Sequence, residues 1–306
     1  MREKIKGYLE KLFKILKKPE MAILPANIAF YIILAVIPLL TIIVLIASYF
    51  DISIDLVSNL VKNIMPDGVS EVIIEVISGK GFDKNVGLFN IIAFILASNG
   101  TYAIITTSNA LYKIKKSDYL KDRISSLILL LIIIILFVFL LVVPIFGESI
   151  LKLMTSAKLL ASYADEIIVL FNFIKWPITL LITYINIKLI YAVSPSKNIK
   201  SDETSYGAAI TTIGWVFATL IFKFYITYFA RYDILYGNLS TIIIMMVWIY
   251  VLSYIFVFGM AINVSRREEQ ELIEEQQRLE EEKKEQEKSK NIKNKKNKKD
   301  QQEEKI

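Results

Sequence analysis

The chain has 306 residues, 55% of them apolar, with a mean hydropathy of +0.50 and a formal net charge of +6. It contains no cysteine and no histidine. These absences exclude disulfides, thiolate nucleophiles and Cys- or His-ligated metal sites, and they remove the commonest general base. We therefore expect a protein with no metal and no cofactor.

Six long apolar stretches follow one another between Met21 and Val264. Crossing the ~30 Å hydrocarbon core of a bilayer takes about 20 apolar residues, and lipid requires every backbone hydrogen bond to be made within the protein. The sequence thus predicts an all-α membrane protein. Its six transmembrane helices are expected at about residues 22–50, 88–112, 124–147, 167–193, 206–230 and 234–264.

Lysine and arginine concentrate in alternate connections, where they mark the cytoplasmic side. The segment before Met21, the segments 113–123 and 188–205, and the tail after Val264 hold seven, five, three and thirteen of them. The other connections hold three, two and one. Both termini are therefore expected in the cytoplasm, on either side of a membrane domain at residues 21–265.

The two terminal segments differ in character. Residues 1–20 place apolar side chains at helical spacing among lysines, which predicts an amphipathic helix on anionic cytoplasmic lipid, although topology control explains the same lysines. The tail at 266–306 holds thirteen basic and thirteen acidic residues. Its first half is expected to be helical and 288–305 disordered, and a solvated tail is favoured over nucleic-acid binding. A protein partner for the tail stays open.

Only two charged residues lie well inside the stretches, Lys175 in the fourth and Lys223 in the fifth. Each lies about eight residues from the outer end of its expected span. Both are therefore expected ~12 Å below the outer boundary of the membrane core, because an α-helix rises about 1.5 Å per residue. Such residues usually face a cavity or the bundle interior, so an anionic ligand such as a lipid headgroup or phosphate is one interpretation. Snorkelling of both lysines to the outer interface is the other, slightly favoured one.

The second stretch is the most polar. Its side chains either hydrogen-bond between packed helices or, less favoured, line a pathway. The candidate lining residues are Asn90, Asn99, Thr101, Thr106 and Asn109.

An ordered set of residues resembles the YihY/BrkB family of integral membrane proteins over about residues 20–265. The set consists of Phe30, Tyr31, Pro38, Tyr191, Pro195, Gly207, Tyr236, Gly237, Trp248, Tyr250, Gly259 and Asn263. The chain departs from the family pattern at Ala261, where a glutamate is common. The resemblance implies a six-span protein of the bacterial cytoplasmic membrane and no established activity, since the family's older label, ribonuclease BN, is regarded as mistaken.

Two classes of function remain open, neither of them enzymatic. Metal-dependent RNA hydrolysis needs histidine or carboxylate clusters, and the sequence suggests none. The first class is a transporter or flippase for an anionic lipid or envelope precursor, with Lys175 and Lys223 at the anion. The second is a scaffold that holds envelope or division proteins without transport.

Overall fold

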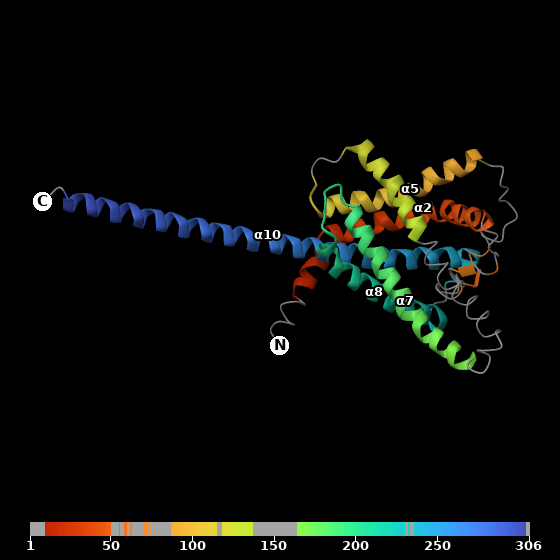
Figure 1. Ribbon diagram of the computed structural model, residues 1–306. Coiled ribbons are helices and arrows are strands. Elements are labelled where there is room, and N and C mark those ends of the chain that lie inside the picture. Colours follow the sequence, from red (N-terminus) through yellow and green to blue (C-terminus); the bar gives the residue numbers. More distant parts are fainter. Residues whose placement is uncertain are drawn as a thin grey trace. The chain divides into compact units, whose positions relative to one another are not determined.

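The computed structural model describes residues 10–49, 87–114, 118–136, 164–229 and 236–303, with isolated positions at 55, 58, 59, 62, 70, 71, 74 and 232. All regular secondary structure in these residues is helical (Figure 1). This confirms the all-α class for the described part of the chain.

The long helices follow the apolar stretches of the sequence. They are α2 (Glu20–Tyr49), α5 (Gly87–Leu111), α7 (Ala164–Val193), α8 (Ser205–Tyr228) and α10 (Ser240–Glu303). Short 3-10 turns, η2 (Ser201–Thr204) and η3 (Gly237–Leu239), precede α8 and α10. A further helix covers residues 119–136, and a short one covers Glu10–Leu16.

Three helical segments are long and apolar enough to cross a membrane: Trp176–Val193, Ser201–Tyr228 and Ser240–Lys284. A fourth arises if Glu10–Leu16 and Glu20–Val36, which meet at a bend of 60°, are counted as one span. The count of six and the cytoplasmic placement of both termini stay predictions. Much of the first and third connections and residues 137–147 of the third stretch lie outside the described residues.

Many large apolar side chains on these helices are exposed, including Phe173 and Trp176 on α7 and Phe217 and Ile221 on α8. A water-soluble protein rarely leaves such an apolar surface uncovered. Exposure of this kind on long helices is typical of a surface that faces lipid.

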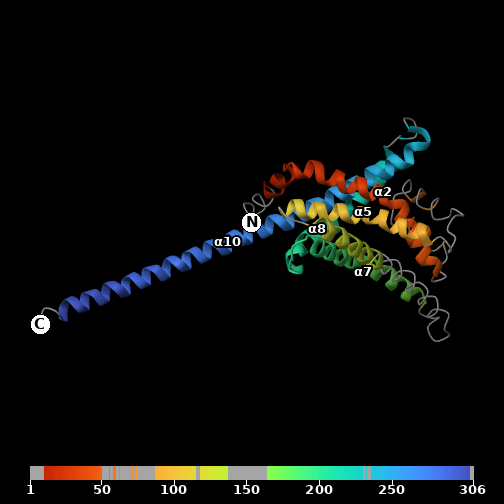
Figure 2. The ribbon, with the colours of Figure 1, turned by 90° about the horizontal axis from the view of Figure 1, so that it is seen from above.

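Helices α2 and α5 pack side by side in both views (Figures 1 and 2). Gly100 of α5 lies against Ala35 and the backbone around Tyr31 of α2. A second core joins α2, α8 and α10, where Ala29 and Phe222 belong to one buried cluster with Trp248.

Helices α7 and α8 form an antiparallel hairpin. Helix α7 ends at Val193 and α8 begins at Ser205. The two helices pack side by side and run in opposite directions (Figures 1 and 2). The link at 194–204 contains an irregular stretch followed by η2. This link contributes residues to each of the two polar clusters described below.

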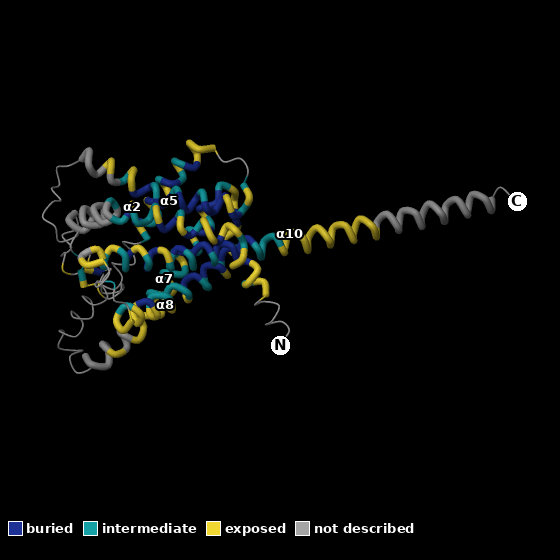
Figure 3. Tube along the Cα trace, turned by 180° about the vertical axis from the view of Figure 1, so that it is seen from behind, coloured by how far each residue is buried: buried dark blue, intermediate teal, exposed yellow. Residues whose placement is uncertain are grey.

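Two compact units divide the chain, residues Met1–Asn263 and Val264–Ile306, and α10 contributes to both. Within the first unit α10 is largely buried from Phe256 to Asn263, whereas 269–284 in the second unit is exposed throughout (Figure 3). The helix runs on to Glu303, through residues that the sequence analysis expected to be disordered. The tail is rich in Glu, Lys and Gln, which favour helix, and Arg267 pairs with Glu271 one turn later.

Candidate functional site

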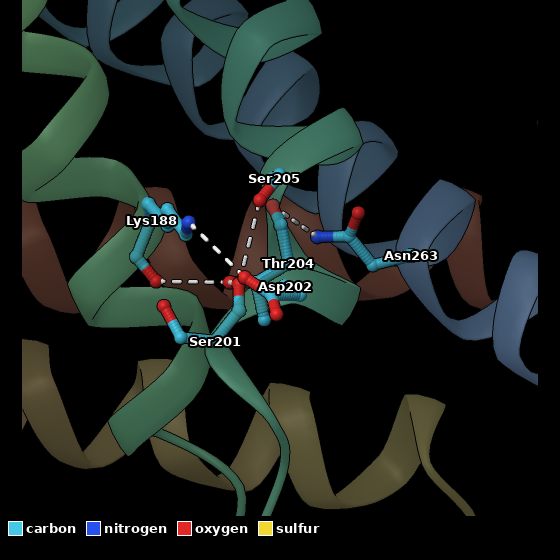
Figure 4. A network of polar contacts seen from close by, with 6 residues as sticks. All are labelled: Lys188, Ser201, Asp202, Thr204, Ser205 and Asn263. Atoms are coloured by element: carbon cyan, nitrogen blue, oxygen red, sulfur yellow. Dashed lines mark hydrogen bonds and ion pairs between the residues drawn. The ribbon is translucent and has the colours of Figure 1, made fainter.

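The first polar cluster, which we call the α8 cap, closes the N-terminal end of α8. Its N-cap residue, Thr204, makes no capping hydrogen bond with its own side chain. Instead Asn263 of α10 reaches across (Figure 4). Its Oδ1 accepts a hydrogen bond of 2.6 Å from the Gly207 N–H, and its Nδ2 donates one of 3.2 Å to the Thr204 carbonyl. Asn263 is only 1% exposed, so its Oδ1 and its Nδ2 both make their hydrogen bonds away from water.

Two glycines let α8 and α10 touch at this cap. A Cβ on Gly207 would collide with the Gly259 carbonyl oxygen and with the Asn263 side chain. A Cβ on Gly259 would collide with Thr211 Oγ1 and would stand 2.7 Å from the Tyr191 hydroxyl. The helix backbones are therefore in direct contact, and only glycine fits at both positions.

Tyr191 joins α7 to the same contact. Its buried hydroxyl lies 2.7 Å from Thr211 Oγ1 and donates a 2.6 Å hydrogen bond to the Phe256 carbonyl. One turn before Tyr191, Lys188 Nζ lies 4.0 Å from an Asp202 carboxylate oxygen in η2 (Figure 4). Asp202 is fully exposed, so this ion pair adds little to stability.

The second cluster, which we call the carboxylate cluster, consists of Asn109, Asp122 and Ser196. Asn109 Nδ2 donates to Asp122 Oδ2 at 3.2 Å and to Ser196 Oγ at 2.8 Å. Ser196 donates through Oγ to Asp122 Oδ1 at 2.6 Å and through its N–H to Asn109 Oδ1 at 2.9 Å. The cluster ties together the end of α5, the start of the helix at 119–136 and the link after α7. Asp122 is only 3% exposed.

Arg123, the residue after Asp122, binds residues of α5. Arg123 donates to Asn99 Oδ1 at 2.9 Å and to the Ile95 carbonyl at 3.4 Å, and its guanidinium lies 5.6 Å from the centre of the Tyr102 ring. Arg123 is thereby bound along α5 rather than to its neighbouring carboxylate.

Lys223 lies exposed on α8, in a band of aromatic side chains that we call the aromatic band. Phe224 packs against Tyr228, with ring centroids 4.9 Å apart, and Tyr225 contacts Tyr232, which stacks on Tyr236. A hydrogen bond with Tyr225, and after it burial, raises the pKa of Tyr232. Tyrosine-rich bands of this kind are typical of a membrane interface.

The predicted lining residues of α5 are used mainly to hold helices together. Thr101 Oγ1 lies 2.7 Å from the Ser126 carbonyl of the next helix, Asn99 binds Arg123, and Asn109 belongs to the carboxylate cluster. Thr106 Oγ1 donates to the Ala103 carbonyl of its own helix. The side chain of Asn90 lies outside the described residues, as does that of Lys175.

The family-pattern residues lie in several parts of the described structure. Tyr191, Gly207, Gly259 and Asn263 meet at the α8 cap, and Pro195 is buried in the adjoining link. The remaining positions lie elsewhere along the described helices and the turn before α10. Phe30, Tyr31 and Pro38 belong to α2. On α10, Trp248 belongs to the buried core and Tyr250 is exposed. Tyr236 and Gly237 lie in the turn at η3, where Gly237 has a φ of +53°.

Sequence reasoning missed Asp122 and Ser196. Both lie in connections that looked hydrophilic and basic, and neither stands in a recognisable motif. The one available signal was position, because Asp122 lies two residues before the third apolar stretch and one turn after Asp118, which caps the helix by accepting from the Leu120 N–H.

Comparison with known proteins settles the family. The profile described as Virulence factor BrkB matches residues 12–286. The chain belongs to this family. The resemblance seen in the α8 cap residues and in the rest of the ordered set is thereby confirmed.

Two relatives illustrate the range of the family. The chain is 26% identical over 270 residues to the Bacillus subtilis protein named putative ribonuclease-like protein YfkH, covering 87% of this chain and 97% of the relative. It is 31% identical over 112 residues to UPF0761 membrane protein IL2447 of Idiomarina loihiensis, covering 36% of this chain and 39% of that one. No solved structure matches the chain. The family and its membrane character are thus established, without an activity.

Proposed function

We propose that the protein moves an anionic lipid or envelope precursor across the bacterial cytoplasmic membrane, with Lys175 and Lys223 contacting the anionic group. The observation that carries the proposal is the position of Lys223. Its side chain is exposed within a candidate span, and no ion pair to it is found among the described residues. An ammonium group at such a place is costly unless it meets an anion or water.

The α7–α8 hairpin supports pairing the two lysines. Lys175 lies eighteen residues before Val193, and Lys223 lies eighteen residues after Ser205. At the rise of an α-helix, both lie about 27 Å along the hairpin from its linked end. Two positive charges at the same distance along the hairpin suit a phosphate, or another anion with two exposed oxygen atoms, better than a single lysine does.

The aromatic band supports a lipid as the source of that anion. Aromatic side chains with polar tips gather at the level of lipid headgroups, and the band follows Lys223 along the chain, from Phe224 to Tyr236. A lysine that lies below this level can extend its long stem toward the phosphate groups. The proposal involves no hydrolytic step, because the sequence lacks the histidines and cysteines on which much hydrolytic chemistry depends.

The test is flipping of a fluorescent phosphatidylglycerol by the purified full-length protein in vesicles. The double variant Lys175→Met/Lys223→Met should lose most of the flipping rate, and the double Lys→Arg variant should keep much of it. Lys197→Met, at an exposed lysine of the link, is the control and should leave the rate unchanged. Unchanged flipping in the double Met variant would refute the role of these lysines.

Truncation separates transport from the scaffold function. The first compact unit ends at Asn263, so a chain ending at Arg267 keeps all of that unit and should remain folded. If the protein is a transporter, the truncated chain should still flip lipid. If flipping is absent in every variant, and cells carrying only the truncated chain lose function, a scaffold that works through the tail is the better description.

A further inference from the structure

We propose that the carboxylate cluster, Asn109, Asp122 and Ser196, binds a dehydrated monovalent cation, Na⁺ or K⁺. The inference concerns the end of the bundle opposite the aromatic band, and it does not depend on lipid transport. It starts from the buried charge of Asp122.

Asp122 is a buried carboxylate whose two hydrogen-bond partners among the described residues are neutral. Its side chain is 3% exposed, Oδ2 accepts from the Asn109 amide and Oδ1 accepts from the Ser196 hydroxyl. No ion pair to Asp122 is found in the described part of the chain. Of the two basic residues next to it in sequence, Lys121 is exposed, and Arg123 is bound to Asn99 and to the Ile95 carbonyl.

Two neutral hydrogen bonds do not neutralise a charge. Taking a carboxylate out of water costs several kcal/mol, and this penalty is offset when an opposite charge comes close. One carboxylate calls for one positive charge. A single monovalent cation therefore balances the cluster without leaving an excess of either sign.

The atoms at the cluster are the right ligands for such an ion. Alkali and alkaline-earth ions are hard cations that prefer oxygen. The cluster brings together the two Asp122 oxygens, Asn109 Oδ1 and Ser196 Oγ from three separate segments. Ser196 belongs to the non-helical link after α7, and ions in membrane proteins are commonly held where a helix gives way to irregular backbone.

Two further buried hydroxyl groups lie close to the cluster residues in sequence. Ser108 precedes Asn109, and Ser194 lies two residues before Ser196, and their side chains are 0% and 1% exposed. Neither hydroxyl oxygen has a hydrogen-bond partner among the described residues. A buried hydroxyl without a partner is costly, so each of them would gain from an ion or a water within its reach.

The experiment measures thermal unfolding of the full-length protein in nanodiscs, in NaCl, KCl or choline chloride at equal ionic strength. Binding to the folded state should raise Tm above the choline value by about 3–6 °C at ten times the dissociation constant. The rise should saturate with concentration. A response to Na⁺ alone or to K⁺ alone supports the site and identifies the ion.

Two variants locate the response. Asp122→Asn removes the charge and should abolish the salt-specific rise. Asp118→Asn makes the same charge change at an exposed position four residues earlier and should retain it. Should Asp122→Asn not fold, Ser196→Ala keeps the carboxylate and should weaken binding several-fold, as measured by titration calorimetry with NaCl and KCl against wild type.

Three results would overturn the proposal. The first is an equal Tm in all three salts. The second is a salt response that persists in Asp122→Asn, or an affinity that is unchanged in Ser196→Ala. The third is stabilisation by lower pH in choline chloride with no response to Na⁺ or K⁺, which would show that a proton, rather than a metal ion, neutralises Asp122.

Discussion

Asn263 replaces a missing local cap with a side chain from another helix. The first N–H groups of a helix have no partner within it, and here the Gly207 N–H is satisfied by an amide 56 residues away in the chain. Because both Asn263 bonds are buried, their loss leaves a donor and an acceptor unsatisfied. We predict that Asn263→Ala lowers the free energy of unfolding by about 1–3 kcal/mol.

The measurement is thermal unfolding of the purified protein in nanodiscs. Asn198→Ala, at an exposed asparagine of the link, should leave Tm unchanged. Equal Tm values for Asn263→Ala and wild type would mean that the α8 cap contributes no stability.

The family resemblance named Asn263, Gly207 and Gly259, but not their contact with one another, and sequence reasoning named Asn109 of the carboxylate cluster only as a lining residue. Asp122 was missed for a physical reason. Asp122 lies among lysines in a segment that looks solvated. Its burial depends on Ser196, 74 residues later, folding back from the link, and no local pattern records that contact.

At the scale of helices, the α8–α10 contact is closer than ordinary side-chain packing allows. Trp215 Nε1 of α8 donates to the Leu252 carbonyl at 2.9 Å, and the two glycines bring the backbones together farther along. We predict that Gly207→Ala destabilises the protein by about 1–3 kcal/mol, because the new methyl group forces two backbones apart.

Gly100→Ala is the matched comparison. It is also a buried helical glycine, but the nearest atom to its new Cβ is Ala35 Cβ at 3.4 Å, an ordinary contact. Since alanine favours helix over glycine by about 1 kcal/mol, Tm should stay level or rise. Equal losses in the two variants, measured by thermal unfolding, would show that the α8–α10 contact is no tighter than the α2–α5 contact.

The apolar stretches predicted where the described helices lie, but not where every helix stops. Hydrophobicity located α7 and α8 to within a few residues, since lipid exposure dictates composition. The last apolar stretch ends at Val264, and the first half of the tail was expected to continue as helix, but α10 runs on to Glu303 over charged residues with strong helix propensity.

For the whole molecule, the polar features divide between two ends. The link at 194–204 holds both the α8 cap and the carboxylate cluster, through Thr204 and Ser196, while the aromatic band lies at the far end of α8. The positive-inside pattern assigns the link to the cytoplasm and the band to the outer surface. The cation site and the anion-binding lysines would then lie toward opposite faces of the membrane.

Because the chain has no cysteine, single cysteines can test this arrangement without background. Lys197→Cys and Tyr236→Cys replace exposed residues at the two ends of the α8 span, and Glu281→Cys replaces an exposed residue of the tail. In right-side-out vesicles a membrane-impermeant maleimide should label Cys-substituted Tyr236 only, and in inside-out vesicles the other two only. Labelling of positions 197 and 236 from the same side would contradict a crossing by α8. The reverse pattern would keep the crossing and invert the orientation, which would place the carboxylate cluster at the outer face.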